Sequence, residues 1–466
     1  MIRSSVIFFL FLTTVSILLI VFPSGCAQIG LPTGGPRDTI PPKLVRSSPP
    51  MNSTNFTGNR LTLTFDEYVN VVDVGNNVIV SPLQKINPTV DYKLRTVTVR
   101  LKDTLLPNTT YSINFGNAIV DNNENNPLHN FTYVFSTGNT IDSLELEGKV
   151  IVAESGKVDS SLIVLLYRNT DDSAVQKIKP NYIAKLNGSG NFTFKNLSAG
   201  TYKIYALKDG DGGKTYNSKT EMFGFADKPV VVSAKSEPVT LYVSAEEKEN
   251  KAAIGAALGN AFSRDKKLRY TTSLDGQMQE LTDPFQFNFN KRLKDWSLPD
   301  LVILDSNNKR VLPMKSELDS TKKKLDINVA WKESMSYRMI VDKKAFTDTS
   351  NNNLSKSDTI KFTTKKAADY GNVVLRFSNL EISKHPLLEL VIGDEVKYSF
   401  PLTTAEWSKS LIKPGEYEMR IVYDENQNGK WDPGKYAVKR QPEKVLALPQ
   451  KLNVKENWDN EQDIRL

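Results

Sequence analysis

The chain has 466 residues, and at about 150 residues per domain this length predicts three or four domains rather than a single core. Hydrophobic residues make up 39% and charged residues 24%, an ordinary soluble composition, and 25 glycines and 23 prolines are too few for a collagen-like or low-complexity protein. The net charge of +7 is spread along the chain, which disfavours dedicated nucleic-acid binding. One cysteine and two histidines exclude a four-ligand Cys/His zinc site, a disulfide framework and a redox cysteine pair.

Residues 1–25 have the layout of a signal peptide. Arg3 precedes an uncharged apolar run of 17 residues, Val6 to Phe22, and the small pair Ser24-Gly25 follows it. Since a run of about 17 residues is the lower limit for crossing a bilayer, a permanent membrane helix is the alternative interpretation. Cleavage is favoured because Cys26, the only cysteine, directly follows this run and a small residue.

The segment Phe22-Pro23-Ser24-Gly25-Cys26 resembles a bacterial lipoprotein signal. This resemblance implies that Cys26 is lipidated and anchors the protein to a membrane, followed by a Gly- and Pro-rich tether over 26–42. Surface-exported lipoproteins of the Bacteroidota often carry acidic residues just after the lipidated cysteine, and residues 27–30 contain none. We therefore expect an outer-membrane lipid anchor, with the periplasmic side favoured over the cell surface.

Residues 43–139 are predicted to form an antiparallel β-sandwich. Leu61–Phe65, Val97–Leu101 and Tyr111–Phe115 alternate apolar and polar side chains, and turn clusters such as Asp121–Asn125 separate them. The region from Pro41 to Thr137 resembles the bacterial Ig-like domain also seen in surface-layer proteins. The resemblance rests on Leu63-Thr64-Phe65-Asp66, Leu106-Pro107-Asn108-Thr109-Thr110-Tyr111 and Phe135-Ser136-Thr137.

A second β-sandwich is predicted over residues 143–245. Its marks are Leu162–Leu166, Gly190–Phe194 and Leu197–Tyr202. This stretch resembles the transthyretin-like, or carboxypeptidase-regulatory-like, sandwich common in outer-envelope proteins of the same bacteria. Residues 246–259 are Ala-rich and predict a linker or short helix.

The pair of sandwiches is predicted to be duplicated. Tyr111 and Tyr337 are 226 residues apart, and Asp121 and Asp348 are 227 apart. Phe135 and Phe362 are also 227 apart, and these nearly equal offsets favour duplication over coincidence. We expect a second, divergent Ig-like domain over 260–365. Gly200-Thr201-Tyr202 and Gly415-Glu416-Tyr417 are 215 apart, which predicts a second, divergent transthyretin-like domain over 370–466. The expected fold class is all-β, with tandem β-sandwich modules.

One turn has the spacing of a calcium loop. Side-chain oxygens stand at positions 1, 3, 5 and 9, with Gly429 at position 6, but Lys435 stands where a bidentate glutamate is required. A tight turn capped by Asp and Asn side chains is the favoured interpretation, and structural calcium is the alternative. The candidate ligands are Asp424, Asn426, Asn428 and Asp432 through their side chains and Lys430 through its carbonyl oxygen.

No catalytic constellation is found in the sequence. His129 and His385 lie in different predicted domains, and Asp66 and Glu67 are adjacent on a strand, where side chains point to opposite faces. Trp407 and Trp431 are more easily explained as sandwich core residues than as sugar platforms. No cofactor is required by any of these patterns.

These features predict a non-catalytic, lipid-anchored cell-envelope protein whose four sandwiches form a stiff arm for binding or scaffolding. Its expected partners are the membrane, through Cys26, and an envelope protein or glycan, with no nucleic acid. The alternative is a carbohydrate-binding lipoprotein of a glycan-handling system, for which an aromatic platform beside Asp or Asn at a sandwich edge would be the supporting feature. An enzyme with paired carboxylates is disfavoured.

Overall fold

The computed structural model describes residues 37–248, 267–312 and 314–466. The predicted signal peptide, Cys26, most of the predicted tether and most of the predicted 246–259 linker therefore lie outside the described residues. Across the described ranges the chain has the predicted all-β fold, with two four-residue helices, α2 (Val74–Asn77) and α3 (Ala174–Lys177). No helix in these ranges is long and apolar enough to cross a membrane.

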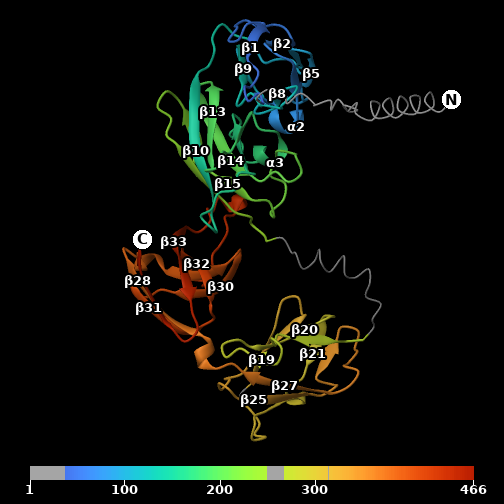
Figure 1. The fold of residues 1–466 in the computed structure, drawn as a ribbon, viewed down its shortest axis with the longest axis vertical. Coiled ribbons are helices and arrows are strands. Elements are labelled where there is room, and N and C mark those ends of the chain that lie inside the picture. The colour runs from blue at the N-terminus through green and yellow to red at the C-terminus, as the bar shows by residue number, and fades with distance from the viewer. Residues whose placement is uncertain (1–36, 249–266, 313) are drawn as a thin grey trace, which may run out of the picture. The chain divides into compact units, whose positions relative to one another are not determined.

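The Cα positions divide the chain into two compact units. Among the described residues, the first contains 37–80, 86–104 and 113–135, and the second contains 81–85, 105–112, 136–248, 267–312 and 314–466. Strand pairing separates the strands more finely, into four sets that we call modules 1 to 4; Figure 1 follows them along the chain.

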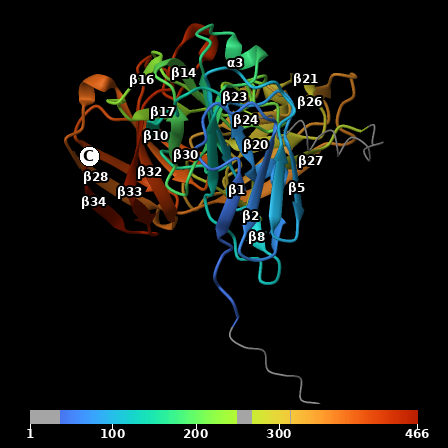
Figure 2. The ribbon, with the colours of Figure 1, turned by 90° about the horizontal axis from the view of Figure 1, so that it is seen from above.

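Module 1 contains nine strands: β1 (Leu44–Ser48), β2 (Arg60–Phe65), β3 (Val69–Val71), β4 (Ile79–Ser81), β5 (Thr89–Lys93), β6 (Thr96–Arg100), β7 (Thr110–Asn114), β8 (Ile119–Asp121) and β9 (Thr132–Ser136). They pair in the orders β1-β2-β6-β5, β4-β7-β9 and β3-β8, and Figure 2 shows β1 beside β2. The alternation in β2 explains the layer, because Leu61, Leu63 and Phe65 are buried while Thr62 and Thr64 face the other way.

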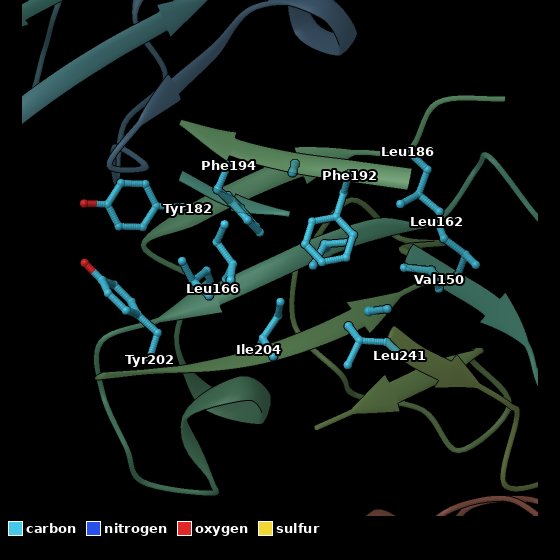
Figure 3. Close-up of a cluster of buried hydrophobic side chains, with 14 of the residues drawn as sticks. Val150, Leu162, Leu166, Tyr182, Leu186, Phe192, Phe194, Tyr202, Ile204 and Leu241 are labelled. Carbon is cyan, nitrogen blue, oxygen red and sulfur yellow. The ribbon is translucent and has the colours of Figure 1, made fainter. Parts of the chain in front are cut away.

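Module 2 contains eight strands: β10 (Leu144–Val152), β11 (Ile163–Tyr167), β12 (Tyr182–Lys185), β13 (Asn191–Leu197), β14 (Gly200–Leu207), β15 (Phe223–Phe225), β16 (Val230–Val232) and β17 (Val239–Val243). One sheet has the order β13-β10-β17, with β17 parallel to β10; the other has the order β12-β11-β14-β15, and β16 also pairs with β14. Figure 3 shows side chains from the two sheets meeting in the core, among them Phe192, Phe194, Leu166 and Ile204.

Module 3 contains β18 (Tyr270–Thr272), β19 (Met278–Gln279), β20 (Phe285–Phe289), β21 (Leu293–Trp296), β22 (Leu301–Leu304), β23 (Lys315–Leu318), β24 (Lys324–Asn328), β25 (Ser336–Val341), β26 (Phe346–Asp348) and β27 (Asp358–Thr364). Its orders are β18-β20-β24-β23, β19-β27-β25-β22 and β21-β26. This arrangement follows that of module 1 strand by strand. The additional strand β19, parallel to β27, corresponds to a single parallel bridge between Ser53 and Phe135 in module 1.

Module 4 contains β28 (Gly371–Ser378), β29 (Pro386–Ile392), β30 (Glu395–Pro401), β31 (Glu406–Ile412), β32 (Gly415–Tyr423), β33 (Val445–Val454) and β34 (Asp459–Arg465). Short 3-10 turns lie at Leu298–Asp300 in module 3, at Ala367–Asp369, which precedes β28, and at Ile382–Lys384 and Tyr436–Val438 in module 4. The sheets of module 4 have the orders β31-β28-β34 and β30-β29-β32-β33. The central strand β28 is antiparallel to β31 and parallel to β34, as β10 is to β13 and β17.

Candidate functional site

The predicted calcium loop follows β32 and begins with a buried carboxylate. Asp424 is only 2% exposed, and its two oxygens accept hydrogen bonds from the backbone N–H groups of Asn428 at 3.1 Å and Gly429 at 2.7 Å. A carboxylate that caps two backbone N–H groups is the arrangement of a tight Asx-type turn. The first ligand position therefore has a complete structural role in the chain itself.

The remaining candidate ligands bind one another. Asn426 and Asn428 both donate their amide N–H groups to Oδ2 of Asp432, the latter at 2.7 Å, and Oδ1 of Asn428 accepts the Lys430 N–H at 3.0 Å. Amide N–H donors thus point at the Asp432 oxygen that a bound cation would contact. Among the described residues, no group of three or more His, Cys, Asp and Glu side chains is placed to hold a metal ion. The geometry favours the turn, and calcium binding stays a prediction.

Glu443 closes this loop from the far end. Its Oε1 accepts the Glu425 N–H at 3.0 Å and its Oε2 accepts the Asp432 N–H at 2.9 Å, while its carbonyl oxygen accepts the indole N–H of Trp431 at 3.0 Å. Burial, followed by the nearby carboxylates of Asp424 and Asp432, raises the pKa of Glu443, and the N–H bonds oppose this. Sequence spacing does not identify Glu443, because it lies 11 residues beyond Asp432 and outside the loop pattern.

The same loop carries Tyr436 of module 4 into a core formed by module 2. Tyr436 is 5% exposed; its hydroxyl lies 3.0 Å from that of Tyr205 and donates to the Asp172 carbonyl at 2.7 Å. Its ring meets those of Phe223 and Phe225 edge-on, at centroid distances of 5.1 and 5.2 Å. We call this set the aromatic cluster; its buried members are Leu165, Tyr167, Ala174, Val175, Ile183, Tyr205, Leu207, Tyr216, Phe223, Phe225 and Tyr436.

Polar contacts surround the inserted tyrosine. Its own N–H donates to Glu246 at 2.8 Å, the Gly434 N–H donates to the Ser244 hydroxyl at 3.0 Å, and the Gln441 amide donates to the Phe225 carbonyl at 3.0 Å. The loop is therefore bonded to the preceding half of the chain through the backbone N–H groups of Gly434 and Tyr436 and through the side chain of Gln441. Because buried backbone groups require partners, these bonds make the insertion specific rather than a loose apolar contact.

A buried ion pair lies on the corresponding sheet face of module 4. Arg420 of β32 and Glu389 of β29 are 6% and 3% exposed, with Nε and Oε2 3.2 Å apart, and Arg420 Nη1 donates to the Glu154 carbonyl of module 2. Burial raises the pKa of Glu389, and Arg420 opposes that rise. At the edge of this contact, Lys157 of module 2 pairs with Glu418 of module 4 at 2.8 Å.

A cavity of about 410 Å³ adjoins the ion pair. Its wall is mainly apolar, with Arg420 as its one buried charged side chain, and includes Val152, Met222, Met419, Leu448 and Pro449. Modules 2 and 4 thus meet through the aromatic cluster and through this second, charged contact. Module 4 therefore contacts module 2 although module 3 lies between them in the sequence.

The match of module 1 to a known family is direct. Residues 38–137 match the family model of the bacterial Ig-like domain. This Ig-like domain was expected from the motifs between Pro41 and Thr137, and the match confirms that resemblance. No curated protein is similar to this chain.

Several solved structures show distant likeness. Native alpha-2-macroglobulin from Escherichia coli aligns at 15% identity with a TM-score of 0.20, covering 39% of this chain and 71% of that one. The major pilin subunit BcpA of Bacillus cereus aligns at 10% identity with a TM-score of 0.17, covering 70% and 99%. The N-terminal part of the bacterial S-layer protein SbsC aligns at 16% identity with a TM-score of 0.17, covering 45% of each chain. At these scores the likenesses carry no argument about function.

In the Ig-like domain, the adjacent carboxylates Asp66 and Glu67 lie near other acidic side chains. Asp66 caps the Lys43 N–H at 2.8 Å. Burial and then Asp121, Asp66, Asp38 and Glu124 raise the pKa of Glu67. The structure therefore gives Asp66 a capping role and leaves Glu67 in a negative environment without an acid–base partner of opposite charge among the described residues.

The two histidines and the two candidate tryptophans have structural neighbours. His129 lies 3.0 Å from the Asn117 side-chain oxygen, and His385 lies 3.2 Å from the Gln427 amide. Trp407 is half-buried against Phe400, at a centroid distance of 4.9 Å, and Trp431 is half-buried with its N–H bonded to Glu443. Neither tryptophan ring is mainly exposed to solvent.

Proposed function

We propose that this chain is a non-catalytic scaffold of the bacterial cell envelope whose sandwiches are joined into a stiff body, so that partners bind to fixed surfaces. The observation that carries the proposal is Tyr436, a side chain of module 4 that is buried in the aromatic cluster of module 2. A shared core makes relative motion of two modules costly, whereas modules joined only by linkers move independently by default.

The envelope location rests on the Ig-like domain and on the sequence around Cys26. We propose a lipid anchor at Cys26 and a duplicated pair of Ig-like and transthyretin-like sandwiches. The repeated strand order of modules 1 and 3, and of modules 2 and 4, supports the duplication.

The anchor is tested by the intact mass of the membrane-extracted full-length protein, expressed in a related host, beside a Cys26→Ala variant. We expect the mass of residues 26–466 plus acyl chains, and loss of that mass in the variant. An unprocessed chain that the substitution leaves unchanged would contradict the anchor and favour a retained membrane helix.

The scaffold is tested by Tyr436→Ala, with Val438→Ala as the matched control because Val438 lies in the same turn and is 65% exposed. Loss of a buried aromatic residue should speed limited proteolysis between Asp424 and Glu443 by at least about tenfold, and the control should behave as the parent. Equal proteolysis of Tyr436→Ala and the parent would overturn the shared-core scaffold.

A further inference from the structure

Trp458 differs from the other four tryptophans of the chain. Trp296, Trp331, Trp407 and Trp431 are half-buried, and each packs on a core cluster or donates its indole N–H within the protein. Trp458, in the loop between β33 and β34, is 60% exposed. An exposed Trp ring leaves a large apolar face in water, which is unfavourable unless something covers it.

The loop that carries Trp458 is held in place. The Trp458 carbonyl oxygen accepts the Asn372 N–H at 2.9 Å and the Asn460 amide at 3.1 Å, and the Asn457 N–H donates to the Tyr370 carbonyl at 2.8 Å. Asn457 adopts a left-handed conformation with φ of 54°, as Asn tolerates in turns. The ring is therefore presented from a fixed backbone, with little ordering cost left for a ligand.

The residues that flank Trp458 in the chain are polar and include more negative than positive charges. Every residue from Lys455 to Asn460 other than Trp458 is polar, with Glu456 and Asp459 against one cation. Lys455 places its ammonium group over one face of the ring, 5.0 Å from the centroid, which leaves the opposite face for a ligand. Protein-binding hot spots lie within a desolvated patch, and this loop supplies hydrogen-bonding groups around the ring instead. An anionic ligand is disfavoured by the same charges.

We infer that the β33–β34 loop is a binding site for a neutral pyranose glycan, with Trp458 as its stacking platform. The electropositive C–H face of a pyranose ring matches the electronegative face of the indole. The side chains of Asn457 and Glu456 supply the hydrogen-bonding groups for its hydroxyls, since the described side chains of Asn372, Asp459 and Asn460 are already bonded to the protein. This site goes beyond the scaffold role and is independent of the contact between modules 2 and 4.

Affinity electrophoresis of the full-length protein in native gels tests the site. The gels contain laminarin, mannan or dextran as neutral polysaccharides, or polygalacturonate as the acidic one. We expect retardation by at least one neutral polysaccharide, at least about tenfold weaker binding for Trp458→Ala, and partial recovery for Trp458→Phe. The matched control is Tyr242→Ala, which removes an aromatic ring, 42% exposed, from module 2.

Thermal unfolding of each variant shows that the fold is intact, so that lost binding is assigned to the ring. Unchanged retardation of Trp458→Ala, no retardation by any neutral polysaccharide, or retardation by polygalacturonate alone would each overturn the inference. Tyr436→Ala is expected to bind as the parent does, which separates a failure of this site from a failure of the scaffold.

Discussion

Modules 1 and 3 each contain a buried aspartate, and the ionisable side chain beside it is acidic in module 1 and basic in module 3. In module 1, the Asn122 N–H bonds to the Tyr68 carbonyl, and in module 3 the Thr349 N–H bonds to the Arg292 carbonyl. Tyr68 and Arg292 therefore occupy equivalent positions, and the residues that precede them, Glu67 and Lys291, correspond to each other.

Asp121 and Asp348, 1% and 0% exposed, each accept several backbone N–H bonds. Burial opposes their ionisation, but these bonds hold both pKa values below the ordinary range. Lys291 adds an ion pair to Asp348 at 3.4 Å, whereas Glu67 adds a second negative charge near Asp121. The backbone turn is therefore sufficient to hold the aspartate, and the adjacent charge tunes the stability of each module.

Modules 2 and 4 show a second contrast. Leu165 pairs with Tyr205 in module 2, and at the corresponding register Glu389 pairs with Arg420 in module 4. The first pair belongs to the aromatic cluster, and the second is a buried ion pair. Buried ion pairs contribute little net stability. The module 4 face therefore has a charged pair in place of the apolar pair, and its Arg420 also donates to the Glu154 carbonyl.

Arg420→Ala should have the largest effect. Removing one partner leaves Glu389 buried without its counter-ion, a loss of about 3 kcal/mol in the free energy of unfolding. Chemical denaturation measures this loss of stability, and hydrogen exchange of β29 and β32 locates it in module 4. Arg376→Ala is the control: it removes an exposed arginine that pairs with Glu461 at 2.8 Å and should lower the free energy of unfolding much less. Equal costs for the two variants would show that the buried pair has no special role.

Importing the module 2 pair sharpens the same comparison. The double variant Glu389→Leu with Arg420→Tyr removes both charges together, and we expect its stability to lie within about 1.5 kcal/mol of the parent. Proteolysis of the turn near Glu154 reports the lost hydrogen bond separately from global stability. A double variant as unstable as Arg420→Ala would mean that the contact with Glu154, rather than charge pairing, is the main contribution.

The charge exchange between modules 1 and 3 comes next in size. Lys291→Glu places a like charge beside the buried Asp348 and should lower the local stability of module 3 by about 1–3 kcal/mol. Glu67→Lys should raise that of module 1 by up to about 1 kcal/mol, because Glu67 is only half-buried. Hydrogen exchange of β26 and β8 separates the two modules within the full-length protein. Effects of the same sign in both variants would contradict the equivalence of positions 67 and 291.

The sequence was sufficient for the Ig-like domain because its strands alternate regularly and its motifs are local, as at Leu63-Thr64-Phe65. The contact of Tyr436 with Tyr205 joins residues 231 positions apart, and no local pattern encodes it. Glu443 lies 11 positions beyond Asp432, outside the loop pattern that the spacing describes. Spacing alone predicts metal ligands at Asp424 to Asp432, and it cannot show that backbone N–H groups bond to the Asp424 carboxylate or that amide groups bond to Oδ2 of Asp432. Trp407 and Trp431 were considered for sugar stacking, whereas the exposed ring is Trp458, because exposure depends on packing.

The smallest expected effect is a pH dependence that distinguishes modules 1 and 3. The raised pKa of Glu67 gives module 1 a stability contribution that is fully present below the unfolded value of about 4.3 and is lost as the pH rises through the folded value. The lowered pKa of Asp348 acts in the opposite sense: its contribution is present above about 3.9 and is lost as the pH falls through the folded value. Lowering the pH from 7 to 4.5 should therefore increase the protection of β8 and leave that of β26 unchanged by Asp348, as measured by hydrogen exchange corrected for intrinsic rates. Glu67→Gln should abolish the gain in β8, and a gain that persists in this variant would assign the effect to another group.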